Sequence, residues 1–338
     1  MKIDNLINIA ITTVVVLSQS ACVLITPKDE PTVQVSTLQA GPAEFQSYKL
    51  SGKNGPDIEY YISKTKERSP LILFIQGSGC TPVFIPNGPK LYGSTVYNLI
   101  PFAALERYAV MVVKKPYTAS KPAPTGTKNY CPLDFNEYFT AETWSTAVQV
   151  AFRHARQLPW VDSKRSLVIG FSEGATIASV LASSEPSITN VALVGATGPT
   201  QFYDFVVAAY RGASDDDEVQ RKLTDLEAQR IKIAASPNSA DEFAWGHPYK
   251  RWSSFFRTSS TQHLLKSKAR VYIVSGMQDK NVPILSTETL ASELITAGHD
   301  VSIRRIPRAG HNLFAEGGAW SDSDPEYHRI LKWFDSEK

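Results

Sequence analysis

The sequence predicts an α/β fold in which helices cover both faces of a mostly parallel sheet. Short apolar runs alternate with amphipathic helical stretches along most of the chain, and this alternation is typical of parallel sheets. Runs such as Leu71–Ile75 are apolar at every position, as expected for strands that are buried on both faces. No internal repeat interrupts this pattern.

The composition describes an ordinary globular protein. Of the 338 residues, 43% are hydrophobic and 20% are charged, which is enough material for one large domain or two small ones. The formal net charge is only +2, so the charge gives no reason to expect a nucleic-acid partner.

The first 21 residues are predicted to be a signal peptide. Lys2 precedes an apolar run that is too short to span a membrane comfortably, and small residues follow directly before Cys22. This layout resembles a bacterial lipoprotein signal, although Gln19 stands where such signals usually carry Leu. We therefore expect export to the periplasm or outer membrane, with a lipid anchor on Cys22. The alternative is an ordinary signal peptide without lipid.

The cysteine count agrees with export. If Cys22 carries lipid, Cys80 and Cys131 remain as a pair, and both lie in Pro-containing loops. An oxidising compartment would allow them to form a disulfide. The alternative is two unpaired thiols.

The first half of the chain is predicted as follows. Residues 22–44 are polar and aperiodic and suit a tether, and the folded domain is expected to span 45–338. Lys115 and Tyr117 follow a strand and are expected to be solvated loop residues; the alternative is that they line a substrate pocket. The elements are a hairpin over 45–62, a strand at 71–75, a helix at 91–107, a strand at 108–113, a loop at 118–136, a helix from Thr140 to Leu158, and a strand at 167–171.

The second half keeps the alternation except for one insertion. Residues 198–265 break the rhythm and are expected to form a mostly helical cap, in which the acidic run 215–218 is a solvated helix start. The remaining elements are strands at 190–195, 269–276 and 301–306 and helices at 286–297 and 325–336.

A Gly-x-Ser-x-Gly motif, residues 170–174, lies between a buried strand and a helix of small residues. Such a strand-to-helix turn exposes Ser172, and the flanking glycines avoid collisions that a Cβ would cause. A serine hydroxyl needs a base to become a nucleophile. The motif therefore makes Ser172 a candidate catalytic residue if a base reaches it.

Two later loops carry suitable partners for Ser172. Asp279 follows the strand at 271–275, and His311 follows the strand at 301–306. The carboxyl ends of parallel strands meet at one sheet edge, so we expect a Ser172, Asp279 and His311 triad there. Asp204 or Glu242 in the cap is the fallback acid.

These motifs resemble those of the α/β-hydrolases, over roughly residues 45–336. Among them, the chain is similar to bacterial enzymes of the dienelactone hydrolase and prolyl-oligopeptidase type. The resemblance implies an eight-stranded, mostly parallel sheet. It also implies acyl transfer through Ser172, with the oxyanion held by the backbone N–H groups of Glu173 and Ser78. The sequence departs from the usual His-Gly-Gly oxyanion turn, because residues 76–78 are Gln-Gly-Ser. The side chain of Glu173 is expected at the pocket mouth or on the surface.

The leading interpretation is a serine hydrolase that cleaves small carboxylic esters without a cofactor or a metal ion. A peptidase, amidase or thioesterase with the same triad is one alternative. A prolyl-oligopeptidase-type enzyme would normally carry a propeller domain, for which the residues between Cys22 and the first strand leave no room. A catalytically silent binding protein of the same fold is another alternative. The sequence leaves the oligomeric state open.

Overall fold

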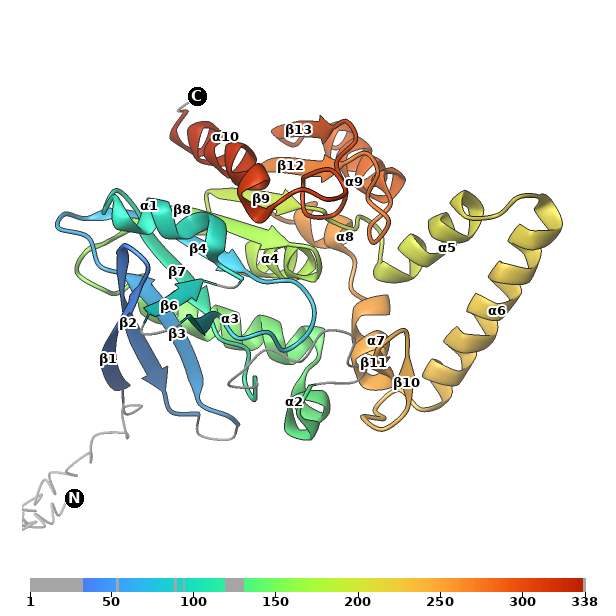
Figure 1. Ribbon diagram of the computed structural model, residues 1–338, viewed down its shortest axis with the longest axis horizontal. Coiled ribbons are helices and arrows are strands. Elements are labelled where there is room, and N and C mark those ends of the chain that lie inside the picture. Colours follow the sequence, from blue (N-terminus) through green and yellow to red (C-terminus); the bar gives the residue numbers. More distant parts are fainter. Residues whose placement is uncertain (1–32, 53–54, 88–89, 94, 119–130, 337–338) are drawn as a thin grey trace, which may run out of the picture. The chain divides into compact units, whose positions relative to one another are not determined.

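A sheet of eleven strands forms the centre of the fold (Figure 1). The computed structural model describes residues 33–52, 55–87, 90–93, 95–118 and 131–336. Six neighbouring strands run parallel, namely β13 (Val301–Ile306), β12 (Arg270–Gly276), β9 (Asn190–Val194), β8 (Val161–Phe171), β4 (Ser69–Ile75) and β7 (Ala109–Val113). Five more extend the sheet beyond β7 with mostly antiparallel pairing, namely β3 (Ile58–Ser63), β2 (Ala43–Leu50), β1 (Val33–Ala40), β6 (Lys90–Gly93) and β5 (Phe84–Asn87).

All eight predicted strands are present in this sheet, and the three additional strands described in the same sheet are β1, β5 and β6. The predicted tether, 22–44, is wrong for residues 33–44, because β1 and the start of β2 form a hairpin there. The side chains of β1 are mostly exposed, so backbone hydrogen bonds rather than apolar burial hold it in place. Gly41, with a φ of +57°, forms the turn into β2. The predicted signal peptide and Cys22 lie outside the described residues.

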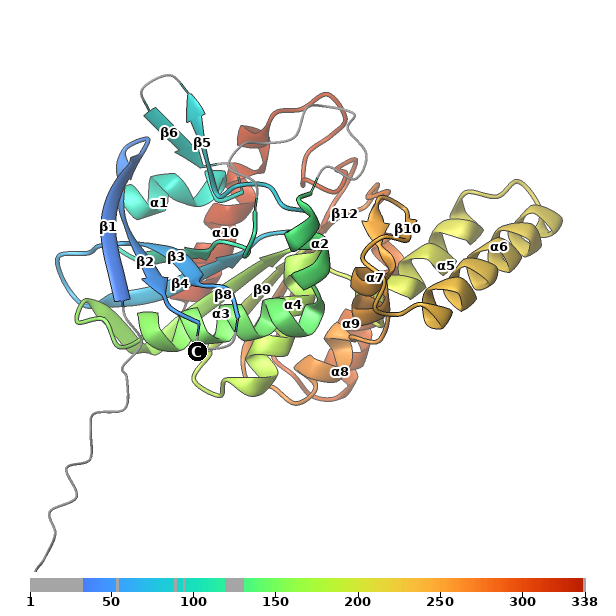
Figure 2. The ribbon, with the colours of Figure 1, turned by 90° about the horizontal axis from the view of Figure 1, so that it is seen from below.

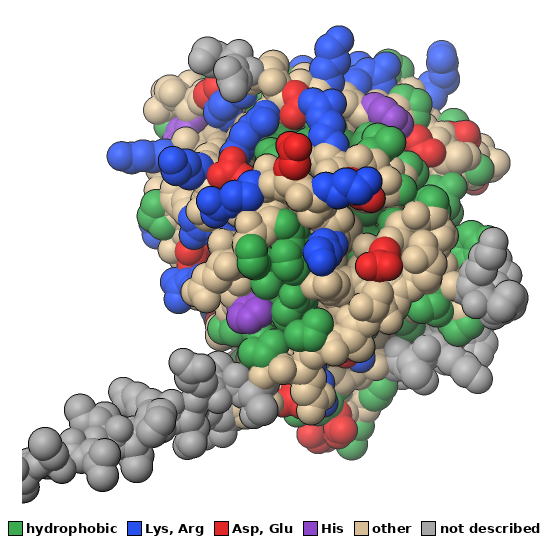
Figure 3. Space-filling view, turned by 90° about the vertical axis from the view of Figure 1, so that its left-hand side faces the viewer, with side chains coloured by type: hydrophobic (Ala, Val, Ile, Leu, Met, Phe, Trp, Pro, Cys, Tyr) green, Lys and Arg blue, Asp and Glu red, His purple; other side chains and the backbone are tan. Residues whose placement is uncertain are grey.

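Figure 3 shows the end of the molecule that carries β1, with apolar side chains gathered in the middle of the face and Lys and Arg side chains around and above them. On β1 itself, Val33 and Val35 are 39% and 55% exposed. These two valines alternate with polar residues that are also exposed, so both faces of β1 are solvated over residues 33–37.

Helices cover both faces of the sheet because alternate strand residues point to opposite sides (Figures 1 and 2). Leu71 and Leu73 belong to the core beneath three helices, α3 (Ala141–Ala155), α4 (Glu173–Ser184) and α9 (Ile284–Thr296). Ile72 and Phe74 belong to the core beneath α1 (Ile100–Ala104) and α10 (Asp324–Asp335). The central strands are therefore buried on both sides, as their unbroken apolar runs predict.

Two predicted boundaries differ from the structure. The helix expected over 91–107 is shorter, because β6 extends to Gly93 and is followed by a 3₁₀ turn (Tyr97–Leu99) and α1. The predicted loop 118–136 contains a short helix at its end, α2 (Leu133–Tyr138). Both are brief elements whose apolar residues are too few to show a period.

The segment between β9 and β12 is mostly helical. It comprises α5 (Gln201–Arg211), α6 (Asp216–Ala235), a small hairpin of β10 (Phe243–Ala244) and β11 (His247–Pro248), α7 (Tyr249–Phe256) and α8 (Ser260–Leu264). In both ribbon views α5 and α6 extend away from the sheet as a helical pair (Figures 1 and 2). The acidic run begins α6, where the side chain of Asp215 accepts a hydrogen bond from the backbone N–H of Glu218 at 2.8 Å.

The described residues belong to one compact unit, Thr32–Lys338. None of the helices in the described part of the chain has the length and hydropathy needed to cross a membrane.

Candidate active site

Ser172 lies at the tip of a sharp turn between β8 and α4. Its backbone is in a strained conformation, with φ 54° and ψ −123°, and its N–H donates to the carbonyl of Val194 at 2.8 Å. A Cβ added at Gly174 would lie 2.1 Å from the carbonyl oxygen of Ile75, and one at Gly170 would lie 2.5 Å from the carbonyl oxygen of Gly174. The turn therefore requires both glycines, as the motif predicts.

Asp279 and His311 meet where β12 and β13 end. His311 Nδ1 lies 2.7 Å from Asp279 Oδ2, and Asp279 is completely buried. The other carboxylate oxygen, Oδ1, accepts backbone hydrogen bonds from Asn281 at 2.8 Å and Val282 at 2.9 Å. A carboxylate held in this way keeps the proton of a neutral imidazole on Nδ1, which leaves Nε2 free to act as a base.

The imidazole of His311 is packed on two sides. The ring of Phe171 lies 5.1 Å from it, measured between centroids. A Cβ added at Gly195, whose φ is +57°, would lie 3.2 Å from two ring atoms of His311. The side chain of His311 is 13% exposed, so only part of the ring faces solvent.

Ser172 and His311 open into one pocket of about 640 Å³. Ser78, Glu173 and residues of the cap, including Phe205, Trp245 and His247, also line this pocket. Among the described residues no hydrogen bond joins Ser172 Oγ to His311. Asp279 lies behind His311, as the predicted triad requires.

The two fallback acids occupy other places. The carboxylate of Asp204 is buried and accepts hydrogen bonds from Thr197 Oγ1 at 2.9 Å and from the hydroxyl of Ser286. Burial raises the pKa of Asp204 to about 7. Glu242 is exposed in the cap. Asp279 is therefore the carboxylate that contacts His311.

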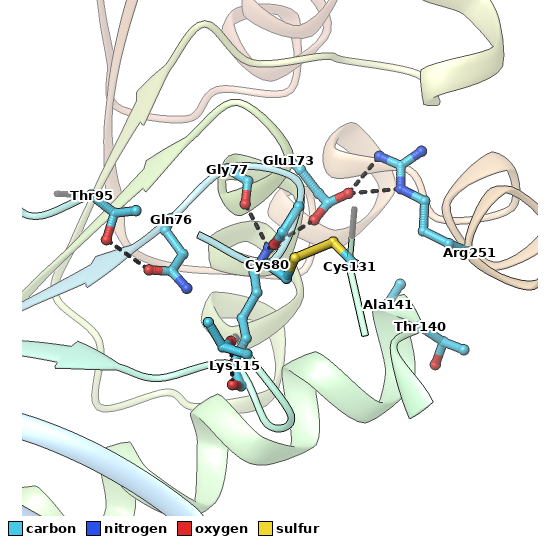
Figure 4. A network of polar contacts seen from close by, with 12 residues as sticks. Gln76, Gly77, Cys80, Thr95, Lys115, Cys131, Thr140, Ala141, Glu173 and Arg251 are labelled. Carbon is cyan, nitrogen blue, oxygen red and sulfur yellow. Dashed lines mark hydrogen bonds and ion pairs between the residues drawn. A yellow bond between two sulfur atoms is a disulfide. The ribbon is translucent and has the colours of Figure 1, made fainter. Parts of the chain in front are cut away.

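Three charged side chains form a buried cluster beside Ser172 (Figure 4). Glu173 is 2% exposed, Lys115 is fully buried and Arg251 is 4% exposed. Lys115 Nζ lies 3.3 Å from Glu173 Oε1, and Arg251 Nε lies 2.9 Å from Glu173 Oε2, which Arg251 Nη2 also contacts. The expectations of a solvated Lys115 and of a Glu173 side chain on the surface are wrong, because each charge is buried against opposite charge. Glu173 does line the pocket.

The electrostatics of the cluster follow from burial and pairing. Burial alone would raise the pKa of the Glu173 carboxyl, but the charges of Arg251 and Lys115 outweigh it and hold that pKa below its ordinary value. Burial lowers the pKa of Lys115 to about 8 even though Glu173 opposes this. Burial and the charge of Arg251 lower the pKa of His247 to about 3, so His247 is neutral at physiological pH.

The turn that follows β4, residues 76–80, is held by hydrogen bonds from two side chains and by a disulfide. Lys115 Nζ donates to the carbonyl of Gly77 at 2.6 Å and to that of Gly79 at 3.0 Å. Thr95 Oγ1 donates to Gln76 Oε1 at 2.7 Å. A disulfide links Cys80 to Cys131, with 5.7 Å between their Cα atoms.

Arg251 and His247 were not predicted from the sequence to belong to this region, and Lys115 was expected to be solvated. Arg251 and His247 belong to an aromatic segment, 245–252, but neither stands in a recognised motif. Lys115 directly follows another lysine at a strand end, which is a common place for a solvated side chain. Within the described residues, no group of three or more His, Cys, Asp or Glu side chains is arranged to hold a metal ion.

Comparison with known proteins gives the fold. The model of the prolyl oligopeptidase family matches residues 219–337. Acetyl xylan esterase 1 from Thermoanaerobacterium sp. JW/SL YS485 is 14% identical with a TM-score of 0.55, and the match covers 91% of this chain and 89% of the esterase. Est1E from Butyrivibrio proteoclasticus is 15% identical with a TM-score of 0.53, covering 86% and 99%.

A peptidase structure is similar over a smaller share of its length. Porphyromonas gingivalis dipeptidyl peptidase 4 is 13% identical with a TM-score of 0.54, and the match covers 91% of this chain but only 36% of that protein. The present chain thus spans about a third of the dipeptidyl peptidase. No curated protein sequence matches the chain significantly. Together with the sheet order, these likenesses show that the chain has the α/β-hydrolase fold.

Proposed function

We propose that this chain is a serine hydrolase that cleaves carboxylic esters through an acyl-enzyme on Ser172. The observation that carries the proposal is the arrangement at one pocket. Ser172 stands in a strained turn, and His311, which lines the same pocket, lies 2.7 Å from the buried carboxylate of Asp279. Neither a metal ion nor a cofactor enters the proposed mechanism.

In the first step, Ser172 Oγ attacks the carbonyl carbon of the ester while His311 Nε2 takes the hydroxyl proton. The new C–O bond places a negative charge on the former carbonyl oxygen. Asp279 stabilises the imidazolium that forms on His311. When the intermediate collapses, the bond to the alcohol oxygen breaks and His311 returns its proton to the departing alcohol.

The negative oxygen is proposed to accept hydrogen bonds from the backbone N–H groups of Ser78 and Glu173. Glu173 is the first residue of α4, so its N–H is one of those that the helix leaves without an internal partner. In the second step, His311 takes a proton from water, the resulting hydroxide attacks the acyl carbon, and the bond to Ser172 Oγ breaks. The acid is released and Ser172 recovers its proton.

The extent of the structural matches supports an ester substrate. The chain aligns with acetyl xylan esterase 1 over 89% of the length of that protein, and the match covers 91% of this chain. A peptidase is the second candidate, because the prolyl oligopeptidase model matches residues 219–337. A thioester would react by the same steps.

Labelling of the purified chain with a fluorophosphonate probe tests the nucleophile. We expect modification at Ser172 that is lost in Ser172→Ala and strongly reduced in His311→Ala. Labelling at a different serine would contradict the triad. No labelling of the folded protein would favour a silent binding protein. Comparing p-nitrophenyl esters of increasing chain length with peptide p-nitroanilides then separates an esterase from a peptidase by kcat/KM.

We also propose that the chain is exported and anchored to a membrane by lipid on Cys22. The Cys80–Cys131 disulfide supports export, because disulfides persist in oxidising compartments. Metabolic labelling with radioactive palmitate in a bacterial host tests the anchor. We expect label on the wild type and none on Cys22→Ser, whereas an unlabelled wild type would indicate an ordinary signal peptide.

A further inference from the structure

The ammonium group of Lys115 has as many acceptors as it has hydrogens. Its Nζ lies 2.6 Å from the carbonyl oxygen of Gly77, 3.0 Å from that of Gly79 and 3.3 Å from Glu173 Oε1 (Figure 4). An ammonium group has three N–H donors and no acceptor, so three oxygen partners satisfy it completely. The rings of Phe139 and Trp144 lie 4.5 and 5.8 Å from Nζ, measured to their centroids.

Two of these acceptors belong to the turn that carries the proposed oxyanion donor Ser78. The carbonyl of Gly77 and the N–H of Ser78 are the two ends of one planar trans peptide unit and point in opposite directions. Fixing the carbonyl of Gly77 on the Lys115 side therefore fixes the Ser78 N–H on the opposite side. The second bond, to the carbonyl of Gly79, holds the following part of the turn, and the disulfide at Cys80 ends it.

The third acceptor belongs to the residue that carries the other proposed donor. Glu173 begins α4, and its carboxylate is held by Lys115 on one oxygen and by Arg251 of α7 on the other. One buried ammonium thus contacts both segments whose N–H groups would bind the oxyanion. Arg251 extends the same network into the cap.

We propose that Lys115 is a positioning residue that orients the backbone N–H groups of Ser78 and Glu173 toward the oxyanion. This inference rests on the proposed function. A requirement for stability does not explain a lysine at this place, since replacing buried ion pairs by apolar side chains of similar size is often neutral or stabilising. A positioning role does explain why the three N–H donors of Lys115 reach both the turn 76–80 and the start of α4.

The pH dependence of catalysis bears on the same group. Burial lowers the pKa of Lys115 to about 8. The charged and titratable groups that act on it are Glu173 from α4 and Arg251 and His247 from the cap. A neutral amine loses one donor and its attraction to Glu173, so kcat should fall as the pH rises through this range. In Lys115→Arg, whose guanidinium stays charged, the fall should disappear.

The decisive experiment measures kcat and KM of the full chain on a p-nitrophenyl ester for two substitutions. Lys115→Met removes the ammonium. The double variant Lys115→Met with Glu173→Gln removes one buried charge of each sign, so the net charge of the cluster is unchanged. Removing an oxyanion donor commonly lowers kcat by about 100- to 1000-fold. If the N–H groups of Ser78 and Glu173 lose their orientation, kcat should fall by roughly 10- to 100-fold in both variants, while KM stays within about 3-fold of the wild-type value.

The neighbouring Lys114 provides a matched control. Its Nζ pairs with Glu59 at 2.7 Å, away from the turn, so Lys114→Met should leave kcat unchanged. If Lys115→Met does not fold, the double variant decides. A folded variant that lacks the ammonium but keeps kcat within about 3-fold of wild type would overturn the positioning role. Recovery of kcat in the double variant alone would also overturn it, because Lys115 would then only neutralise Glu173.

The wild type and Ser172→Ala separate this inference from the proposed function. If the wild type does not turn over the ester, the proposed function fails and the positioning role fails with it. If the wild type is active and Ser172→Ala is not, the Lys115 variants test the positioning role alone.

Discussion

His311 and Asp279 form a hydrogen-bonded pair in which Nδ1 and Oδ2 lie 2.7 Å apart, and the second oxygen of Asp279 is held by two backbone N–H groups. The carboxylate has little freedom to turn away from the imidazole. In the proposed mechanism this pair selects the tautomer of His311 that removes the proton of Ser172.

Asp279→Asn should abolish most of the activity while the protein stays folded. The amide can present an N–H to Nδ1, which favours the wrong tautomer and lowers kcat by about 10⁴-fold in related triads. Steady-state kinetics with an activated ester measure this effect. Glu242→Gln, a change in the exposed fallback acid of the cap, should leave kcat unchanged. A loss of less than about 10-fold in Asp279→Asn would argue against its role.

Gly174→Ala should destabilise the fold at the turn that carries Ser172. Its new Cβ would lie 2.1 Å from the carbonyl oxygen of Ile75, so β4 or α4 must move. Overpacking of this kind costs about 1–3 kcal/mol, occasionally more, and urea unfolding monitored by tryptophan fluorescence measures it. Gly55→Ala is the control, because nothing lies within 4 Å of its new Cβ. Equal stabilities of the two variants would contradict the close packing of the turn.

Removing the disulfide should lower the free energy of unfolding, mainly because the unfolded chain becomes less restricted. Cys80 and Cys131 are separated by 51 residues. In the chain-entropy treatment, closing such a loop raises the free energy of the unfolded state by about 4 kcal/mol. The double substitution of both cysteines by alanine, compared with wild type in urea unfolding, measures the loss. Adding a reductant should destabilise the wild type and leave the double variant unaffected; a reductant effect on both would assign the loss elsewhere.

Asp204 should make the protein less stable as the pH rises from about 4 to about 7. Burial raises its pKa to about 7 in the folded state, above the ordinary 3.8, so over that range the folded state holds a proton that the unfolded state has released. Stability from this group is therefore full below pH 3.8 and is lost as the pH passes 7.

Asp204→Asn removes this pH dependence. Compared with wild type, the variant should therefore gain more stability at pH 8 than at pH 5. We expect the unfolding free energy of the variant to exceed that of wild type by more at pH 8 than at pH 5, with a difference of at least roughly 1 kcal/mol between the two gains. Urea unfolding at the two pH values provides the measurement. A gain that is the same at both pH values would show that the carboxyl of Asp204 does not titrate between them.

Much of the fold and the candidate residues could be predicted from local sequence. Leu71–Ile75 of β4 and Ala109–Val113 of β7 are apolar without interruption, and Ser172, Asp279 and His311 each lie in the turn or loop that follows a strand of the parallel sheet. Because parallel strands end at a common edge, chain order alone predicts that such residues gather there. The structure places Ser172 and His311 on one pocket with Asp279 behind.

The strands β1, β5 and β6 could not be predicted from the sequence, for a physical reason. β1 is mostly exposed, and β5 and β6 are only four residues each. Backbone hydrogen bonds to neighbouring strands hold them, and a backbone carries no residue-specific signal.

The sequence by itself determined the alternation of strands and helices, the strained turn at Ser172 and the order of its partners, because these depend on residues close together in the chain. Only the tertiary structure decided the partners of Lys115. Glu173 and Arg251 lie 58 and 136 residues farther along the chain, and each looks solvated in its own segment. A buried charge becomes tolerable only when distant opposite charges are brought against it, and that pairing is a property of the folded chain.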